Sequence, residues 1–370
     1  MTKAAELAKM GEVLTNSQIG GRRNIVINGA MQVAQRGTSF SLSGTADTFI
    51  TDRFLISNSD TGAWTASQST DSPTGFSNSL KMDCTTADTS PTFLTLMTRF
   101  EGQDLQHLKK GTSSAEKTTL SFFVKSNKTG TYIAELRDID NNRTIGKAYT
   151  ISSADTWEQK IITFDGDTTG AFGNDNGNSL QIIWYLAVGS VYNSGTLATS
   201  WGSRVNANTA VGQVNLADST DNEWYITGIQ LEVGSQATPF EHRSFGEEQR
   251  LCQRYAIVYS KNGQPNMGDK AIGTGASTNS SGGYQAFIFP QVTMRAVPTL
   301  TVGGSVSDYE ILKYETGYVD VNSSISLFSA SGRSLFVLAI SSATAEAERG
   351  RDVIMRLEGD NSSLLFDSEL

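Results

Sequence analysis

Apolar and polar residues alternate over short segments along most of this chain, and Gly, Asn, Asp or Ser residues separate the segments. Between Ser179 and Val188, for example, Leu180, Ile182 and Trp184 fall on one face of an extended strand, and the residues between them fall on the other. Before residue 245, such segments predict strands at Asp52–Asn58, Ser79–Cys84, Thr92–Phe100, Thr119–Lys125, Tyr132–Asp138, Trp157–Phe164 and Ser179–Val188. After residue 250, they predict strands near Tyr255–Tyr259, Ala286–Phe289, Thr299–Val302, Ile311–Tyr314, Ser324–Phe328, Ser334–Ile340 and Val353–Leu357.

Two segments far apart in the sequence bound the first group of strands. In Asn24–Arg36, Ile25 and Ile27 share one face, and Asn28-Gly29 supplies a tight-turn signal directly afterwards. Apolar and aromatic residues also alternate in Glu223–Phe240. We expect these segments to be the first and last strands of one closed β-domain.

Helical patterns occur at only two places. Residues 1–23 begin with an Ala-, Leu- and Lys-rich stretch at helical spacing, which predicts a short helix that needs a docking partner. Ser244 and Glu247 have the spacing of a capping box, which predicts a short helix at a domain junction. The predicted chain is therefore all-β, with an N-terminal helix and linker (1–23), a jelly-roll sandwich (24–245) and a smaller C-terminal β-sandwich (246–370).

Length and composition agree with two β-rich domains. A chain of 370 residues exceeds one ordinary core, its 38% hydrophobic residues suffice for two, and its 35 glycines suit many turns. No apolar run is long enough to span a bilayer, and the N-terminus lacks the regions of a secretory signal. These features predict a soluble protein made in a cytoplasm.

Charge and cysteine usage exclude several classes of partner. The net charge of −9 would repel a nucleic-acid backbone, and no basic cluster with interleaved aromatic residues offsets it. Cys84 and Cys252 lie in different predicted domains, so we expect two free, mostly buried thiols. No CxxC zinc motif and no phosphate-binding Gly-rich loop followed by Lys occurs.

The aromatic residues are the candidates for ligand binding. Proteins that bind sugars stack a ring on the apolar face of a pyranose and bond its hydroxyl groups with amides or carboxylates. On the predicted strand Ser179–Val188, Tyr185 and Gln181 share the face opposite Trp184, so we expect them at the surface. Trp157 and Trp224 stand in apolar alternation, which predicts core packing.

Further aromatic residues stand in loops, where the sequence leaves their role open. Trp201 lies in a polar loop and could contact a ligand or cover the core, Trp64 has the same two possibilities, and Tyr192 completes the set. The tentative glycan-binding residues are Trp201, Tyr185, Tyr192, Gln181 and Trp64. An alternative site in the terminal domain would use Tyr284, Tyr309, Tyr314 or Tyr318.

The Asp- and Asn-rich segment 165–176 could bond hydroxyl groups or hold a cation, but turn formation explains its composition. Catalysis has less support. Neither His107 nor His242 stands in a nucleophile motif, which predicts no catalytic triad. A pair of glycosidase carboxylates has no required spacing in sequence, so that alternative stays open.

Several motifs, in order along the chain, resemble a family of bacteriophage tail-fibre proteins, especially those of cyanophages and other marine phages. The resemblance runs from about Arg22 to Tyr255 through NIVINGAMQVAQRGTSF, DRF, TLSFFVKSNKTGTY, DTWEQKIITF, LQIIWYLAVGS, ITGIQLEVGSQATPFEHRSFGEE and CQRY. FPQVTMRAVPTLTV and the terminal FDSEL resemble the distal region of that family. The resemblance implies a homotrimeric fibre that joins other virion proteins through its N-terminus.

The region from Asn24 to Phe245 is more distantly similar to jelly-roll carbohydrate-binding modules. Those modules open with an Asn-x-x-x-Asn-Gly-x-Phe-Glu pattern, and a Glu and an Asp help to bind a structural calcium. Asn24, Asn28 and Gly29 match this opening, but Gln32 stands in place of the Glu and Gly228 near the expected Asp. Because Ca²⁺ favours carboxylate oxygens, we expect no metal site there.

Together, these observations predict a non-enzymatic tail fibre in the virion, assembled in the host cytoplasm, which adheres to a host surface glycan or lipopolysaccharide. No cofactor and no membrane insertion are expected. One alternative is a head fibre or structural adaptor that binds only virion proteins. The other is a tailspike that depolymerises polysaccharide.

Overall fold

The computed structural model describes residues Lys3, 23–260, 270–277, 283–313, 317–331, 334–340, 352–359 and 361–370. These residues divide into two compact units, residues 1–248 with Leu370 and residues 249–369. The sequence boundary drawn after residue 245 falls three residues before this division. Apart from Lys3, the helix predicted in residues 1–23 lies outside the described residues.

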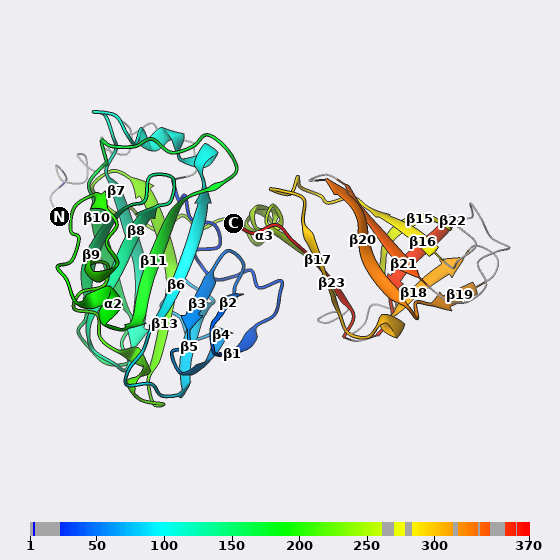
Figure 1. The fold of residues 1–370 in the computed structure, drawn as a ribbon, viewed down its shortest axis with the longest axis horizontal. Coiled ribbons are helices and arrows are strands. Elements are labelled where there is room, and N and C mark those ends of the chain that lie inside the picture. The colour runs from blue at the N-terminus through cyan, green and yellow to red at the C-terminus, as the bar shows by residue number, and fades with distance from the viewer. Residues whose placement is uncertain are drawn as a thin grey trace. The chain divides into compact units, whose positions relative to one another are not determined.

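Two antiparallel sheets form the first unit (Figure 1). Sheet A has the strand order β1 (Ser39–Ser43), β4 (Ala63–Ser69), β5 (Ser79–Thr86), β13 (Glu223–Val233), β7 (Thr118–Ser126) and β10 (Glu158–Phe164). Sheet B has the order β12 (Gly202–Ser203), β9 (Arg143–Ile151), β8 (Gly130–Asp138), β11 (Asn178–Val188), β6 (Phe93–Glu101), β3 (Leu55–Ser59) and β2 (Ala46–Phe49). The short helical segments are η1 (Gly102–Leu108), α2 (Ser190–Asn193), η2 (Asn206–Asn208) and η3 (Leu216–Asp218).

The core of the first unit lies between sheets A and B. On β11, Leu180, Ile182 and Trp184 point into this core, as their spacing predicts. Trp224 on β13 is also fully buried, which confirms its prediction. The same prediction is wrong for Trp157, which lies on the outer face of sheet A and donates its indole N–H to Asp71 at 3.0 Å.

The opening segment is not the strand that its sequence predicts. Asn28 has a φ of 60° and interrupts the extended backbone, and its side-chain amide bonds the backbone of Val33 and Asp52. The predicted neighbour is nevertheless right, because Ile25 and Gly29 bond the backbone of β13 at 2.9 Å each. A Cβ at Gly29 would lie 2.1 Å from the Ile229 oxygen, so only glycine fits this close approach.

The helix α3 (Phe245–Gln253) begins where the capping box predicts, with the Glu247 N–H donating to Ser244 Oγ at 3.3 Å. None of the described helices is long and apolar enough to cross a membrane. Cys84 and Cys252 are both buried, and neither forms a disulfide, as expected.

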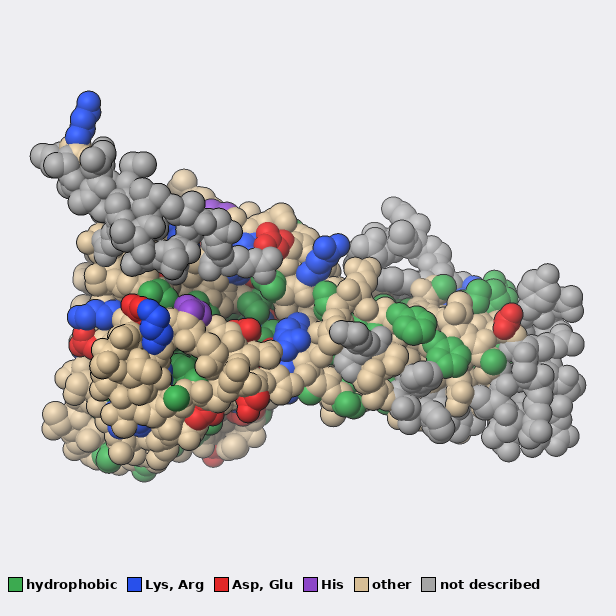
Figure 2. All heavy atoms as spheres, turned by 90° about the horizontal axis from the view of Figure 1, so that it is seen from above, with side chains coloured by type: hydrophobic (Ala, Val, Ile, Leu, Met, Phe, Trp, Pro, Cys, Tyr) green, Lys and Arg blue, Asp and Glu red, His purple; other side chains and the backbone are tan. Residues whose placement is uncertain are grey.

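The second unit also packs two antiparallel sheets around a core. Sheet C has the order β14 (Ala256–Ser260), β23 (Ser363–Asp367) and β17 (Thr299–Gly303). Sheet D has the order β19 (Gly317–Asp320), β18 (Tyr309–Lys313), β22 (Asp352–Leu357), β15 (Lys270–Ser277), β16 (Gly283–Ile288), β21 (Ser334–Ile340) and β20 (Ser324–Ser331), and η4 spans Val306–Asp308. On the face in Figure 2, the described part of this unit shows mostly uncharged side chains, some of them hydrophobic. Because antiparallel sheets build both units, the predicted all-β fold class is confirmed.

Candidate functional site

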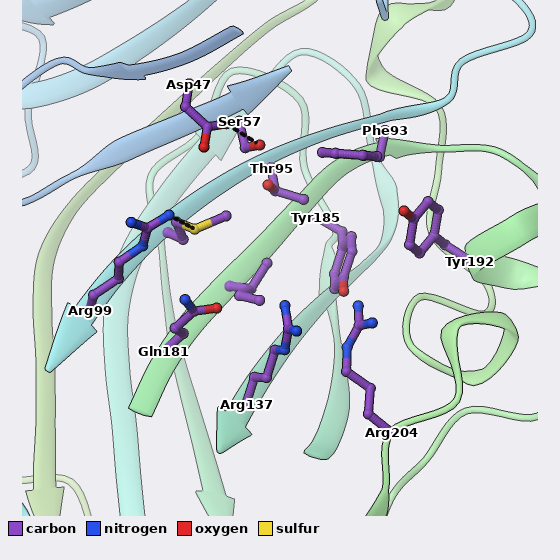
Figure 3. Close-up of a pocket in the computed structure, with 12 residues that line it drawn as sticks. Asp47, Ser57, Phe93, Thr95, Arg99, Arg137, Gln181, Tyr185, Tyr192 and Arg204 are labelled. Atoms are coloured by element: carbon purple, nitrogen blue, oxygen red, sulfur yellow. Dashed lines mark hydrogen bonds between the residues drawn. The ribbon is translucent and has the colours of Figure 1, made fainter. Parts of the chain in front are cut away.

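A pocket of about 220 Å³ opens on the outer face of sheet B, the face turned away from the main core (Figure 3). Strands β3, β6, β11 and β8 form its floor, and residues from β2, α2 and the segment after β12 form its walls. The lining residues are Asp47, Ser57, Phe93, Thr95, Met97, Arg99, Arg137, Gln181, Ile183, Tyr185, Tyr192 and Arg204.

The two-residue period of the strands places these side chains. On β11, Gln181, Ile183 and Tyr185 alternate with the core residues of the same strand and so point outwards. Ile183 and Tyr185 also belong to a small apolar cluster that continues from the pocket to Val188 and Ala210. The segment that follows β11 covers this cluster. The outer face of sheet B is therefore partly covered, and the pocket is the part left open.

A buried carboxylate organises one end of the pocket. Glu135 on β8 is fully buried, and its Oε2 accepts a hydrogen bond of 2.5 Å from the Tyr185 hydroxyl. Its Oε1 accepts a hydrogen bond from Thr144 Oγ1 and lies 3.4 Å from Arg204 Nε. Burial and the nearby Glu135 charge raise the pKa of Tyr185, so this tyrosine stays a neutral donor. For Arg204, burial opposes the charge, but Glu135 outweighs burial and raises its pKa.

Arg137, two residues after Glu135 on the same face of β8, points its guanidinium into the pocket beside that of Arg204 (Figure 3). No group in the described part of the chain accepts a hydrogen bond from this guanidinium, and its Nε is buried without an acceptor. Burial, followed by repulsion from Arg204, lowers its pKa. The pocket therefore holds a half-buried cation without a direct counter-ion.

The rest of the pocket offers polar groups and an aromatic wall. The Oε1 of Gln181 and the Oγ1 of Thr95 are buried without a hydrogen-bond partner in the described chain. At the other end, Ser57 donates to Asp47 at 2.5 Å. Phe93 and Tyr192 pack edge to face with ring centroids 5.4 Å apart. Unsatisfied polar atoms beside an aromatic wall can bond the hydroxyl groups and pack against the apolar face of a bound sugar.

Three of the five residues singled out in the sequence lie together in this pocket: Gln181, Tyr185 and Tyr192. Gln181 and Tyr185 are both more buried than expected. For Tyr185 the reason is the segment after β11, which covers the apolar cluster to which this tyrosine belongs. Trp64 is only 1% exposed and donates its indole N–H to Thr61 O at 2.8 Å, so its assignment as a ligand contact is wrong.

Trp201 does not line this pocket. It packs against the main core, and its indole N–H donates to Asp165 O at 2.7 Å. This position corresponds to its alternative role as a cover for the core. Of the alternative tyrosines in the second unit, Tyr284 and Tyr309 are buried, Tyr318 is exposed, and Tyr314 lies outside the described residues.

Sequence reasoning missed the charged residues of the pocket, namely Asp47, Arg99, Arg137 and Arg204, and the buried Glu135 beneath them. One signal was present in the sequence. Glu135 and Arg137 occupy outward positions of the predicted strand Tyr132–Asp138, on the same face as the apolar Ile133. Charges at such positions are seldom buried without a partner or a function.

The segment 165–176 lies outside the pocket lining, and its acidic groups serve local structure. Arg143 donates to both carboxylate oxygens of Asp167, at 2.7 and 3.0 Å, and Lys110 Nζ lies 3.1 Å from Asp167 Oδ2. Burial alone would raise the pKa of Asp167, but hydrogen bonds from Arg143 and Lys110 outweigh burial and lower it. Asp175 Oδ1 accepts a turn hydrogen bond of 2.8 Å from Gly177 N.

Groups suited to acid–base chemistry are few in this pocket. Among the described residues that line it, Asp47 is the only acid, and no lining residue is a histidine or a cysteine. His242 lies elsewhere and packs on Phe240 with ring centroids 4.8 Å apart. The described lining residues therefore do not include the pair of carboxylates that most glycosidases use.

Comparisons with known proteins leave the family open, since no protein-family model and no curated protein matches the sequence. Among solved structures, the chain is similar to the enzymatically active domain of tailspike protein 4 of bacteriophage CBA120 (15% identity, TM-score 0.31, 57% of this chain and 21% of that chain). It is also similar to a family 4 carbohydrate-binding module (9% identity, TM-score 0.27, 56% and 98%). A third similar structure is the family 11 module of a Clostridium thermocellum cellulosomal cellulase (12% identity, TM-score 0.28, 59% and 99%). The match spans about a fifth of the tailspike chain, and likenesses this distant assign no activity.

Proposed function

We propose that this chain is a non-catalytic tail-fibre protein that binds a surface glycan in the pocket on sheet B. The observation that carries the binding role is the convergence of the Phe93 and Tyr192 wall with the unsatisfied polar atoms of Gln181 and Thr95. A sugar ring has an apolar face for the first pair and hydroxyl groups for the second. Because Asp47 is the only acid among the described lining residues, this geometry favours binding over hydrolysis.

The tail-fibre setting rests on the order of sequence motifs from Arg22 to Tyr255. In this proposal the N-terminal residues attach the chain to the virion, and three copies present three pockets. A pocket of about 220 Å³ has room for little more than one sugar residue, so single-site affinity should be low. Joining three sites raises the effective concentration and can strengthen binding by about 10²–10⁴-fold.

Binding of the intact protein to a panel of bacterial surface polysaccharides and lipopolysaccharides tests this proposal. We expect saturable binding to at least one of them, competed by the soluble polysaccharide and without release of new reducing ends. Binding to none of them, by protein that still assembles onto particles, would favour a structural adaptor. Release of reducing ends would identify a depolymerase.

A further inference from the structure

The charges in the pocket on sheet B separate into two ends. Arg137 and Arg204 lie at one end, and Asp47 with Ser57 lies at the other (Figure 3). Arg99 also lines the pocket, but its guanidinium has partners of its own, the Leu370 carbonyl oxygen among them. A ligand that spans the pocket would meet cations at one end and a carboxylate at the other.

The two arginines differ in how their charges are balanced. Glu135 Oε1 lies 3.4 Å from Arg204 Nε, and Arg204 also donates to Asn206 Oδ1. Both carboxylate oxygens of Glu135 already accept a hydrogen bond from a neighbouring strand, Oε2 from Tyr185 and Oε1 from Thr144. Glu135 therefore pairs with Arg204 and not with Arg137, whose guanidinium has no hydrogen bond or close ion pair in the described chain.

Arg137 is also held in a restrictive place. Its backbone is paired on both sides near the end of β8, where it stands opposite Gln181 on β11 and Thr144 on β9. Half-burial weakens the hydration of the guanidinium, and burial together with Arg204 lowers its pKa. An anion that entered this end would relieve both effects, and the planar guanidinium can donate two parallel hydrogen bonds to a carboxylate or a phosphate.

We infer that the pocket is selective for a negatively charged sugar, with its carboxylate or phosphate group held by Arg137 beside Arg204 and its hydroxyl groups turned towards Gln181, Thr95 and Asp47. This inference rests on the proposed function, because it names the class of glycan for the same pocket. Asp47 adds to the selectivity, since it repels the anionic group and accepts hydrogen bonds from hydroxyl groups. The sugar is thereby oriented as well as bound.

The test uses the intact protein and three probes: alginate, polygalacturonate and lipopolysaccharide. Each is used in its native form and after reduction of its carboxyl groups to alcohols, and the lipopolysaccharide also after removal of its phosphates. We expect at least one native probe to bind roughly 10-fold or more tightly than its neutralised form, as for hydrogen bonds to charged groups. If reduction of the carboxyl groups weakens binding, the anionic group is a carboxylate. If removal of the phosphates weakens binding, it is a phosphate.

Three variants locate the effect. Arg137→Gln should remove the preference for the native probe and leave the affinity for the neutralised probe within about twofold of the wild type. Arg137→Lys should keep part of the preference, because lysine keeps the charge but cannot donate two parallel hydrogen bonds. Lys125→Gln is the matched control: this cation lies 4.3 Å from the ring centroid of Tyr225 on the outer face of sheet A. It should bind both forms as the wild type does.

Three outcomes would overturn the inference. The first is equal binding of native and neutralised probes, which leaves glycan binding intact but removes charge selection. The second is a preference that survives in Arg137→Gln or disappears in Lys125→Gln, which places the anion elsewhere. The third is binding to no probe in any form, which removes the anionic ligand. The wider panel of surface polysaccharides then decides whether the proposed function fails as well. Tryptophan fluorescence confirms that each variant is folded, because all five tryptophans lie in the first unit.

Discussion

Replacing Lys110 with methionine should destabilise the first unit by about 3–5 kcal/mol, the usual effect of removing one partner from a buried ion pair. The Lys110 ammonium donates to Asp138 Oδ2 at 2.6 Å and to the carbonyl oxygens of Thr169 and Gly170 at 2.9 and 2.7 Å. Asp138 is fully buried, so among the described residues the methionine variant would leave its carboxylate only the hydrogen bonds from Asn141. The measurement is denaturant-induced unfolding followed by tryptophan fluorescence.

Lys117→Met is the matched control for this variant. Lys117 forms an ion pair of 2.8 Å with Asp165, but both side chains are more than half exposed. Its loss should change the free energy of unfolding by less than about 1 kcal/mol. Equal effects of the two substitutions would show that the buried network around Lys110 does not stabilise the fold.

Replacing Glu135 with glutamine should also destabilise the first unit, by about 3 kcal/mol, because the neighbouring guanidinium groups of Arg137 and Arg204 would lose the buried carboxylate beside them. The glutamine oxygen can still accept the Tyr185 hydrogen bond, so the effect comes mainly from the lost charge. This loss is at the lower end for a buried ion pair, because the Arg204 side chain is 13% exposed and water partly screens its charge. The same unfolding measurement applies.

A double-mutant cycle with Arg204→Gln separates the ion pair from other effects of the substitution. If Glu135 acts by neutralising Arg204, the double variant should lose less stability than the two single variants summed. Strictly additive losses would mean that the two residues act independently.

Much of the first unit could be predicted from the sequence, because its central strands bury alternate apolar side chains. Each of the seven strands predicted between residues 52 and 188 overlaps a strand of sheet A or B. The strands β1, β2, β4 and β9 were missed, because serine, threonine and charged residues dilute their apolar pattern. The opening segment was predicted as a strand because its pattern is apolar, but the Asn28 amide closes a local turn instead.

The candidate site could be predicted only in part. The face shared by Gln181 and Tyr185 follows from strand periodicity, and the structure places Tyr192 beside them. The burial of Tyr185 depends on the segment that folds back over sheet B, which no local pattern indicates. Arg137 and Arg204 lie 67 residues apart in the sequence, so no local pattern brings them together. That Glu135 pairs with Arg204 and leaves Arg137 unpaired follows only from the folded structure.

The most direct test of the location of the glycan site compares two tyrosines. The affinity of the intact protein for the bound glycan should fall at least about tenfold in Tyr192→Ala, which removes the pocket wall, and should be largely retained in Tyr192→Phe. Tyr318→Ala removes an exposed tyrosine of the second unit that packs on Arg356, and it should bind as the wild type does. Loss of binding in Tyr318→Ala with full binding in Tyr192→Ala would contradict the account and place the site in the second unit.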